Sequence, residues 1–393
     1  MLRTLLAATE QIDDPEAAIA DIKSQLKMEE RLLKNSVGIM ACHYEFADSG
    51  AVKAVCGALP FEVAGTISTL QGIPGRAGTL LLTLMVLTSD DVCFKTALTP
   101  SLKTNAARGI EETYKASTGG ENPALILTYA PFMIENSGDE YTAVLSRVSG
   151  GAPCFGTLSI DDTADFHETY MIHNGVHYRD RMSLIMAFGN ITPKFYLATI
   201  SENRILEKSA LISSSEGHIL KEVNGRPVVE FFESMGLTKA SETSYAMTSL
   251  PFMLDYNDGT PPVFKVFIHL TEQKYALCAG VMPEGSTLRI GVFDHEDVLL
   301  TTQKTLRDAL GALGGASGAL IYSCISRSMS LGADLLAEIE LVGRELSGKL
   351  PFLMAYSGGE ICPTRFNSGP EGPKGIRGAV NRFHNNTFIL CVF

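Results

Sequence analysis

The sequence predicts an α/β (α+β) protein of repeated β-α-β-β units, whose mixed sheets pack against helices in a two-part architecture. Three observations predict it. Strand-like apolar runs alternate with runs of helical spacing, one unit recurs three times, and charged residues make up only 19% of the 393 residues. Because about a quarter of a globular domain is usually charged, this composition indicates a large buried core.

The first element is a predicted leading helix in the segment 1–33. Asp14 and Pro15 open it, with Pro at a position of the first turn where no N–H donor is needed. Ile22 and Leu26 follow at helical spacing. The segment lacks the apolar stretch of a signal peptide, so it is interpreted as part of the folded protein.

The repeated unit begins at residues 36–46, 122–132 and 316–326. Each start is an apolar strand, and a helix with one apolar face follows it. A second strand and further apolar segments complete the unit, and the stretches "AGTIST" and "FGTLSI" share Gly, Thr and Ser in the same order. We interpret the copies as an internal duplication; the alternative is chance similarity among apolar strands.

Other segments join these units. Residues 218–236 are predicted to form a strand, an Asn224-Gly225 turn and a helix. Strand candidates follow, and Asp294 is predicted to cap a helix that runs to Leu313.

The predicted domain boundaries follow from a break in this pattern near residues 236–262. They separate the leading helix from two domains, 34–236 and 237–393. The Gly/Pro-rich stretch 367–378 is predicted to be a loop.

Charge and cysteine content narrow the function. The net charge of −12 argues against nucleic acid or an anionic membrane surface as a partner, because both attract Lys and Arg. None of the eight cysteines forms a CxxC pair, which argues against a zinc site. P-loop, GxSxG and HExxH motifs are missing as well, so we expect no metal and no cofactor. A reduced cytoplasmic protein is the expectation.

The stretch "YSGGE" contains the first candidate ligand-binding residues: Tyr356, Ser357, Gly358, Gly359 and Glu360. Two glycines allow a ligand to approach the backbone closely, and a carboxylate there binds an amino group or a hydroxyl. A tight turn with a solvated Glu is the alternative.

Cys324 and Arg327 lie at a predicted strand-to-helix junction, where a ligand can reach free N–H groups. Arg327 could clamp a carboxylate through two hydrogen bonds, or it could pair with an acid of the protein such as Glu360. Cys324 could be a nucleophile with His384 as its base, or simply a small buried residue.

Polar residues precede the last strand. His384 and Asn385 are candidates for the lining of a pocket, and strand alternation predicts that their side chains lie on opposite faces. Thr66 and Thr157 follow the glycines of the two similar strands, where a hydroxyl can serve a small polar ligand. Ordinary turn and strand roles are the alternative for all four.

Taken together, "YSCISR", "LPFLMAYSGGEICP" and "FHNNT" resemble the C-terminal half of FIST-domain proteins. "AGTIST", "GGAPCFG" and "VNGRPVVEFFESMGL" resemble the N-terminal half, so the resemblance covers roughly residues 15 to 393. It implies a cytoplasmic sensory protein of signal transduction that binds small ligands, amino acids among them, and has no established catalytic activity.

The prediction is therefore a small-ligand sensor that relays to a signalling partner. Its site requires that segments around residues 66, 157, 327 and 360 converge on one hollow. A Cys- or His-dependent hydrolase or transferase that uses Cys324 and His384 is the alternative, and a scaffold that binds only a partner protein is a third possibility.

Overall fold

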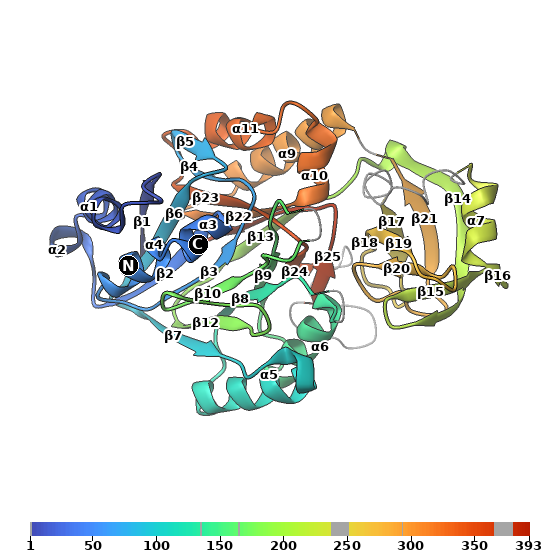
Figure 1. Cartoon of the computed structure of the whole chain (residues 1–393), viewed down its shortest axis with the longest axis horizontal. Coiled ribbons are helices and arrows are strands. Elements are labelled where there is room, and N and C mark those ends of the chain that lie inside the picture. The colour runs from blue at the N-terminus through green and yellow to red at the C-terminus, as the bar shows by residue number, and fades with distance from the viewer. Residues whose placement is uncertain (1, 134–135, 164–165, 237–250, 293, 365–379) are drawn as a thin grey trace.

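The computed structural model of the chain describes residues 2–133, 136–163, 166–236, 251–292, 294–364 and 380–393. The predicted loop 367–378 lies outside them. A core of three sheets stands beside a smaller β-rich part, the insert, formed by the described residues of 199–294 and drawn on the right of Figure 1. This two-part α/β arrangement confirms the predicted fold class. The division into domains at residues 34–236 and 237–393 stays a prediction.

Three six-stranded sheets with the same topology form the core. In pairing order, the first contains β1 (Leu2–Thr9), β6 (Leu82–Ser89), β2 (Asn35–Cys42), β3 (Val63–Ile67), β10 (Met171–His173) and β11 (Val176–Tyr178). The second contains β7 (Val92–Leu98), β12 (Ser183–Gly189), β8 (Leu125–Pro131), β9 (Cys154–Ser159), β24 (Glu360–Thr364) and β25 (Val380–His384). The third contains β13 (Lys194–Ala198), β26 (Phe388–Val392), β22 (Ala319–Cys324), β23 (Phe352–Ser357), β4 (Gln71–Ile73) and β5 (Arg76–Gly78).

The three units exchange hairpins in a ring. Each unit builds four strands of its own sheet, and its hairpin extends the sheet of another unit: β4–β5 joins the third sheet, β10–β11 the first and β24–β25 the second. In every sheet the middle pair is parallel, as in β2–β3, β8–β9 and β22–β23. The shared topology confirms that one unit occurs three times. Each exchanged hairpin holds its own unit to the unit whose sheet it extends.

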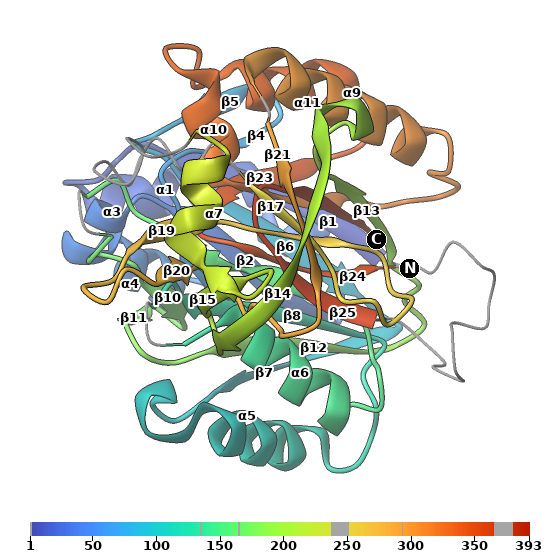
Figure 2. The same ribbon diagram turned by 90° about the vertical axis from the view of Figure 1, so that its right-hand side faces the viewer.

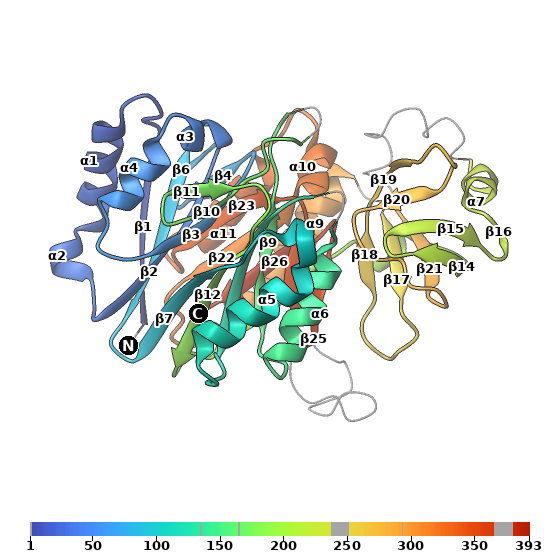
Figure 3. The same cartoon turned by 60° about the horizontal axis from the view of Figure 1, so that its bottom comes forward.

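Helices cover the outer faces of the sheets (Figures 1 and 3). They are α1 (Pro15–Leu26), α2 (Met28–Arg31), α3 (Tyr44–Asp48) and α4 (Ala51–Gly57) on the first sheet, α5 (Leu102–Thr118) and α6 (Gly138–Val148) on the second, and α9 (His295–Leu310), α10 (Ile325–Leu331) and α11 (Ala337–Leu346) on the third. The inner faces meet in one apolar cluster that contains Ile39, Tyr129 and Tyr322. Each sheet is thus buried on both faces, which explains its continuous apolar runs.

The predicted leading helix in the segment 1–33 is wrong at residues 2–9, which form a strand. β1 pairs antiparallel with β6 over its full length. The sequence "LRTLLAAT" is rich in Leu and Ala, which favour helices, so local propensity gave no sign of the strand. Pairing with a distant strand decided it. The helix that follows begins at Pro15, where the sequence predicts its start, and the Asp14 side chain caps it by accepting a hydrogen bond from the Ala17 N–H at 2.9 Å.

The insert has its own core and is reached from β13. Its elements are β14 (Ile205–Glu216), β15 (Ile219–Val223), β16 (Arg226–Pro227), α7 (Val228–Ser234), β17 (Phe252–Asp255), β18 (Val263–Lys265), β19 (Phe267–Leu270), β20 (Ala276–Cys278) and β21 (Thr287–Gly291). Phe232, Phe252 and Phe267 pack together inside it. Figure 2 views the insert from outside, with α7 in front. The predicted Asn224-Gly225 turn is confirmed, since both residues have positive φ, 54° and 71°.

Candidate functional site

The two glycines of "YSGGE" carry the chain from one sheet to another. Ser357 ends β23 in the third sheet, and Glu360 begins β24 in the second. Gly359 has φ 149°, and a Cβ atom on it would lie 2.4 Å from Cζ of Phe383. The group that comes close to the Gly359 backbone is therefore the Phe383 side chain of the protein itself.

Glu360 is fully buried among hydroxyl groups. Its carboxyl group accepts hydrogen bonds from Ser357 Oγ and, at 2.6 Å, from Thr387 Oγ1. Burial raises its pKa to about 8, although these hydroxyls and the nearby Arg327 act in the opposite direction. At neutral pH the group is therefore mostly an uncharged carboxylic acid.

The turn between β25 and β26 lies against Glu360. His384 stands opposite Glu360 in the β24–β25 ladder, and burial lowers the His384 pKa to about 3, so its ring is neutral. The ring lies near the Cys362 backbone, but neither ring nitrogen has a well-formed hydrogen bond within the described part of the chain. The predicted strand alternation ends here, because Asn386 has φ 56° and turns the chain.

The next two side chains leave amide atoms unsatisfied. Asn385 is 1% exposed and Asn386 0%. Within the residues that the structure describes, Asn385 Oδ1 and Asn386 Nδ2 have no hydrogen-bond partner. Since buried polar atoms are nearly always paired, these two atoms are candidates for contact with a ligand or an ordered water.

Cys324 adjoins the same turn. Its backbone N–H donates to Thr387 O at 2.9 Å, and its thiol is buried next to Ser326 Oγ at 3.1 Å. Burial, with Glu360 nearby, raises the pKa of this thiol to about 12. Because the thiolate is the reactive form, these surroundings do not favour Cys324 as a nucleophile.

Arg327 pairs with Glu338, and not with Glu360 as the sequence suggested. The Nη2 and Nε atoms of Arg327 lie 2.8 Å and 3.0 Å from Glu338 Oε1, and both side chains are fully buried. Tyr356 OH donates to Oε2 of the same carboxylate at 2.9 Å. Arg327 and Tyr356 thus belong to a buried ionic network, and of the guanidinium only Nη1 lacks a partner among the described residues.

Thr157 and Thr66 come from the first two units and reach the same end of the sheets. Thr157 stands opposite Glu360 in the β9–β24 ladder. Thr66 Oγ1 donates to Ser159 Oγ at 2.8 Å. The segments predicted to converge are therefore close in space. We call the central group the strand-end cluster: Cys324, Ser357, Glu360, His384, Asn385, Asn386 and Thr387.

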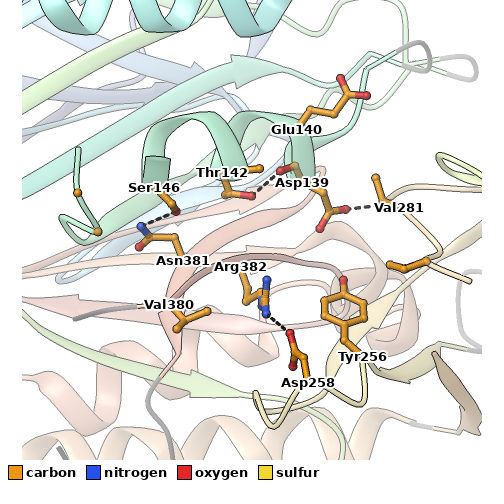
Figure 4. Close-up of a pocket in the computed structure, with 14 residues that line it drawn as sticks. Asp139, Glu140, Thr142, Ser146, Tyr256, Asp258, Val281, Val380, Asn381 and Arg382 are labelled. Atoms are coloured by element: carbon orange, nitrogen blue, oxygen red, sulfur yellow. Dashed lines mark hydrogen bonds and ion pairs between the residues drawn. The ribbon is translucent and has the colours of Figure 1, made fainter. Parts of the chain in front are cut away.

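A groove of about 790 Å³ lies between the core and the insert (Figure 4). Asp139 of α6 lines it, and so do Tyr256 and Asp258 of the insert and Arg382 of β25. Arg382 Nη2 lies 3.1 Å from Asp258 Oδ2, and its guanidinium stacks over the Tyr256 ring. Sequence reasoning missed this groove, because its walls come from four segments that are distant in sequence.

Lys265 stands behind that groove and joins the two parts. It is fully buried, and its Nζ lies 2.8 Å from both carboxylate oxygens of Asp139 and from Phe383 O. A lysine within the apolar run "VFKVFIHL" was the available signal, since a buried lysine needs a partner. Within the described ranges, no group of three His, Cys, Asp or Glu residues could hold a metal.

Sequence comparison identifies two family models along the chain. The FIST N domain matches residues 36–226 and the FIST C domain matches residues 229–363. FIST domains are sensory domains of signal transduction that bind small ligands. No curated protein matches the sequence. None of the described helices is long and apolar enough to span a bilayer.

Two solved structures show weak likeness. One is cyanuric acid hydrolase from A. caulinodans, with 10% identity, TM-score 0.36, and coverage of 100% of this chain and 99% of that chain. The other is phosphoribosylformylglycinamidine synthase II from Thermotoga maritima, with 9% identity, TM-score 0.19, and coverage of 100% and 71%. At these scores neither supports an argument about this protein.

Proposed function

The chain belongs to the FIST family, and from this premise we propose that it is a cytoplasmic sensor that binds a small polar ligand at the strand-end cluster. Ligand binding changes its interaction with a signalling protein. Amino acids are among the ligands that the family resemblance suggests.

The unsatisfied buried atoms of His384, Asn385 and Asn386 carry this proposal. Leaving such atoms without a partner costs about 1–3 kcal/mol each, and a polar ligand that bonds them recovers part of that cost. Neutral Glu360 and the neighbouring hydroxyls supply further donors and acceptors.

A direct bond supports the relay to the insert. The Asn385 N–H donates to Phe264 O of β18 at 2.9 Å, so the turn that would contact the ligand also holds the insert. A ligand that shifts this turn would shift the insert relative to the core. The cytoplasmic assignment is supported by the cysteines, all eight of which are unpaired, as is usual in a reducing compartment.

The test is a thermal-shift screen of small metabolites on the whole chain, because a ligand selective for the folded state raises the melting temperature. Binders are then titrated against Glu360→Gln and Asn385→Ser, with Asn224→Ser in a distant turn as the matched control. We expect weaker binding in the first two variants and none of this effect in the control. Equal dissociation constants in all four proteins would place the site elsewhere.

Arg327→Ala is a poor test of this site. It leaves the Glu338 charge buried without its counter-ion, so it reports on stability and not on ligand contact. Hydrogen exchange at β18 with and without ligand tests the relay; unchanged exchange there would argue against it.

A further inference from the structure

We infer that the strand-end cluster takes an uncharged ligand that offers both an N–H donor and a C=O acceptor, as carboxamides, lactams and ureas do. This inference depends on the proposed function and narrows its ligand class.

The first argument is the kind of atom left unsatisfied. Asn385 Oδ1 is an acceptor and Asn386 Nδ2 is a donor, and neither is paired in the described part of the structure. Both residues are anchored by other bonds, Asn385 through its N–H to Phe264 O and Asn386 through its Oδ1, which accepts from Ser326 Oγ. An acceptor and a donor on adjacent residues match the N–H and the C=O of an amide.

The neutral ring of His384 adds to this set. One ring nitrogen of a neutral imidazole carries a proton and the other accepts a hydrogen bond, so the ring again offers one donor and one acceptor. The ring is 1% exposed and comes from the strand that leads directly into the Asn385–Asn386 turn. The cluster therefore offers both hydrogen-bond donors and acceptors, and a ligand that itself carries a donor and an acceptor can pair with both kinds of group.

The second argument is charge. Three formally charged side chains near the cluster, all in the part of the chain that the structure describes, are already paired with protein groups at 2.8 to 3.1 Å: Arg327 with Glu338, Lys265 with Asp139, and Arg382 with Asp258. Each pair is neutral as a whole. A ligand with a carboxylate or an ammonium group would have to break one of them or remain without a counter-charge, and an unpaired buried charge is strongly unfavourable.

The three titratable groups inside the cluster do not supply a counter-charge either. Burial raises the pKa of the Cys324 thiol to about 12, so the thiol stays uncharged. Glu360 is held among hydroxyls that bond its carboxyl group, and burial raises its pKa to about 8. Burial together with the cations Lys265 and Arg382 lowers the pKa of His384 to about 3. Around neutral pH, the cluster therefore carries little net charge, and it would bind a free amino acid poorly because both charged ends would lose their hydration.

The experiment compares ligand classes on the whole unmodified chain by isothermal titration calorimetry at neutral pH. The uncharged probes are nicotinamide, uracil, hydantoin and urea; the charged ones are alanine, succinate and putrescine. We expect at least one uncharged probe to bind at least about tenfold more tightly than every charged one. Tighter binding of alanine, succinate or putrescine overturns the inference and leaves the proposed sensor standing. Binding of no probe contradicts both.

A variant then assigns the binding to the cluster. Asn386→Asp keeps the shape of the side chain and the Oδ1 acceptor for Ser326 Oγ, but it replaces the unsatisfied Nδ2 donor with an acceptor. We therefore expect the best uncharged probe to bind at least about tenfold more weakly. Asn224→Asp, another asparagine with positive φ in a distant turn, is the matched control and should bind as the parent does. Circular dichroism checks the fold, and Asn386→Gly, which tolerates the positive φ, replaces the variant if it does not fold. An unchanged dissociation constant in the Asn386 variant overturns the inference.

Discussion

Lys265 of the insert and Asp139 of the core, 126 residues apart in sequence, form an ion pair in which Nζ lies 2.8 Å from both carboxylate oxygens. The same carboxylate accepts the Val281 N–H at 2.8 Å, so one acid of α6 holds two points of the insert. The Lys265 side chain is 0% exposed and that of Asp139 16%. A second ion pair between the two parts, Arg382 with Asp258, lies in the groove of Figure 4, which Asp139 also lines.

The first prediction concerns this ion pair. Asp139→Asn should lower the free energy of unfolding by about 3–5 kcal/mol, because a buried ammonium group loses its counter-charge. Chemical denaturation of the whole chain measures the change. Glu140→Gln, on the next residue of the same groove, removes an exposed carboxylate and should change stability by less than about 0.5 kcal/mol. Equal midpoints for Asp139→Asn and the parent would show that the pair does not contribute to stability.

The second prediction concerns the pH dependence contributed by Glu360. Its folded-state pKa is raised to about 8 from 4.5, so the folded protein binds more protons than the unfolded chain between these values. Its contribution is complete below pH 4.5 and is lost as the pH rises through 8, by up to about 5 kcal/mol. Glu360→Gln should remove this loss, measured as a flatter stability profile from pH 5 to 8. Glu121→Gln, at an exposed glutamate, should keep the parent's slope.

The third prediction concerns His384, whose effect has the opposite sign. Its folded-state pKa is lowered to about 3 from 6.5, so the unfolded chain binds more protons in that range. Stability from the neutral ring is present above pH 6.5 and is lost on acidification, by up to about 5 kcal/mol. His384→Gln should lose less stability than the parent between pH 6.5 and 4. The exposed His269→Gln is the control, and parallel profiles for all three proteins would contradict the assignment.

The fourth prediction tests the repeat through equivalent glycines. Cβ atoms on Gly65 and Gly156 would lie 2.1 Å from Met40 O and 2.0 Å from Thr128 O, the parallel neighbour strand in each case. Gly65→Ala and Gly156→Ala should therefore each destabilise the protein by about 2–3 kcal/mol or more. Gly343→Ala, in α11 with open space around the new methyl group, should be neutral or stabilising by up to about 1 kcal/mol. Similar stability of all three variants would mean that the strands can separate without cost.

Local features were readable from the sequence because they depend on neighbouring residues. Asp14 and Asp294 as helix caps, the Asn224-Gly225 turn and the apolar faces of the unit helices follow from spacing and side-chain chemistry over a few positions. The threefold repeat was visible for the same reason, since each copy carries its own strand and helix pattern. The stretches around residues 324–327, 356–360 and 384–387 were also recognisable, and they carried the resemblance to FIST domains.

The tertiary structure alone decided which of these groups meet. It gave Arg327 the buried partner Glu338, brought Thr157 and His384 to either side of Glu360, and exchanged the hairpins around the ring. It also made a strand of residues 2–9 and placed the Phe383 ring against Gly359. Each outcome depends on the distance between segments that are far apart in the chain, and on burial, which sets the charge of Glu360 and His384. Periodicity and propensity contain neither quantity, and for that reason the sequence determined the units and the candidate residues, whereas their packing determined the chemistry of the site.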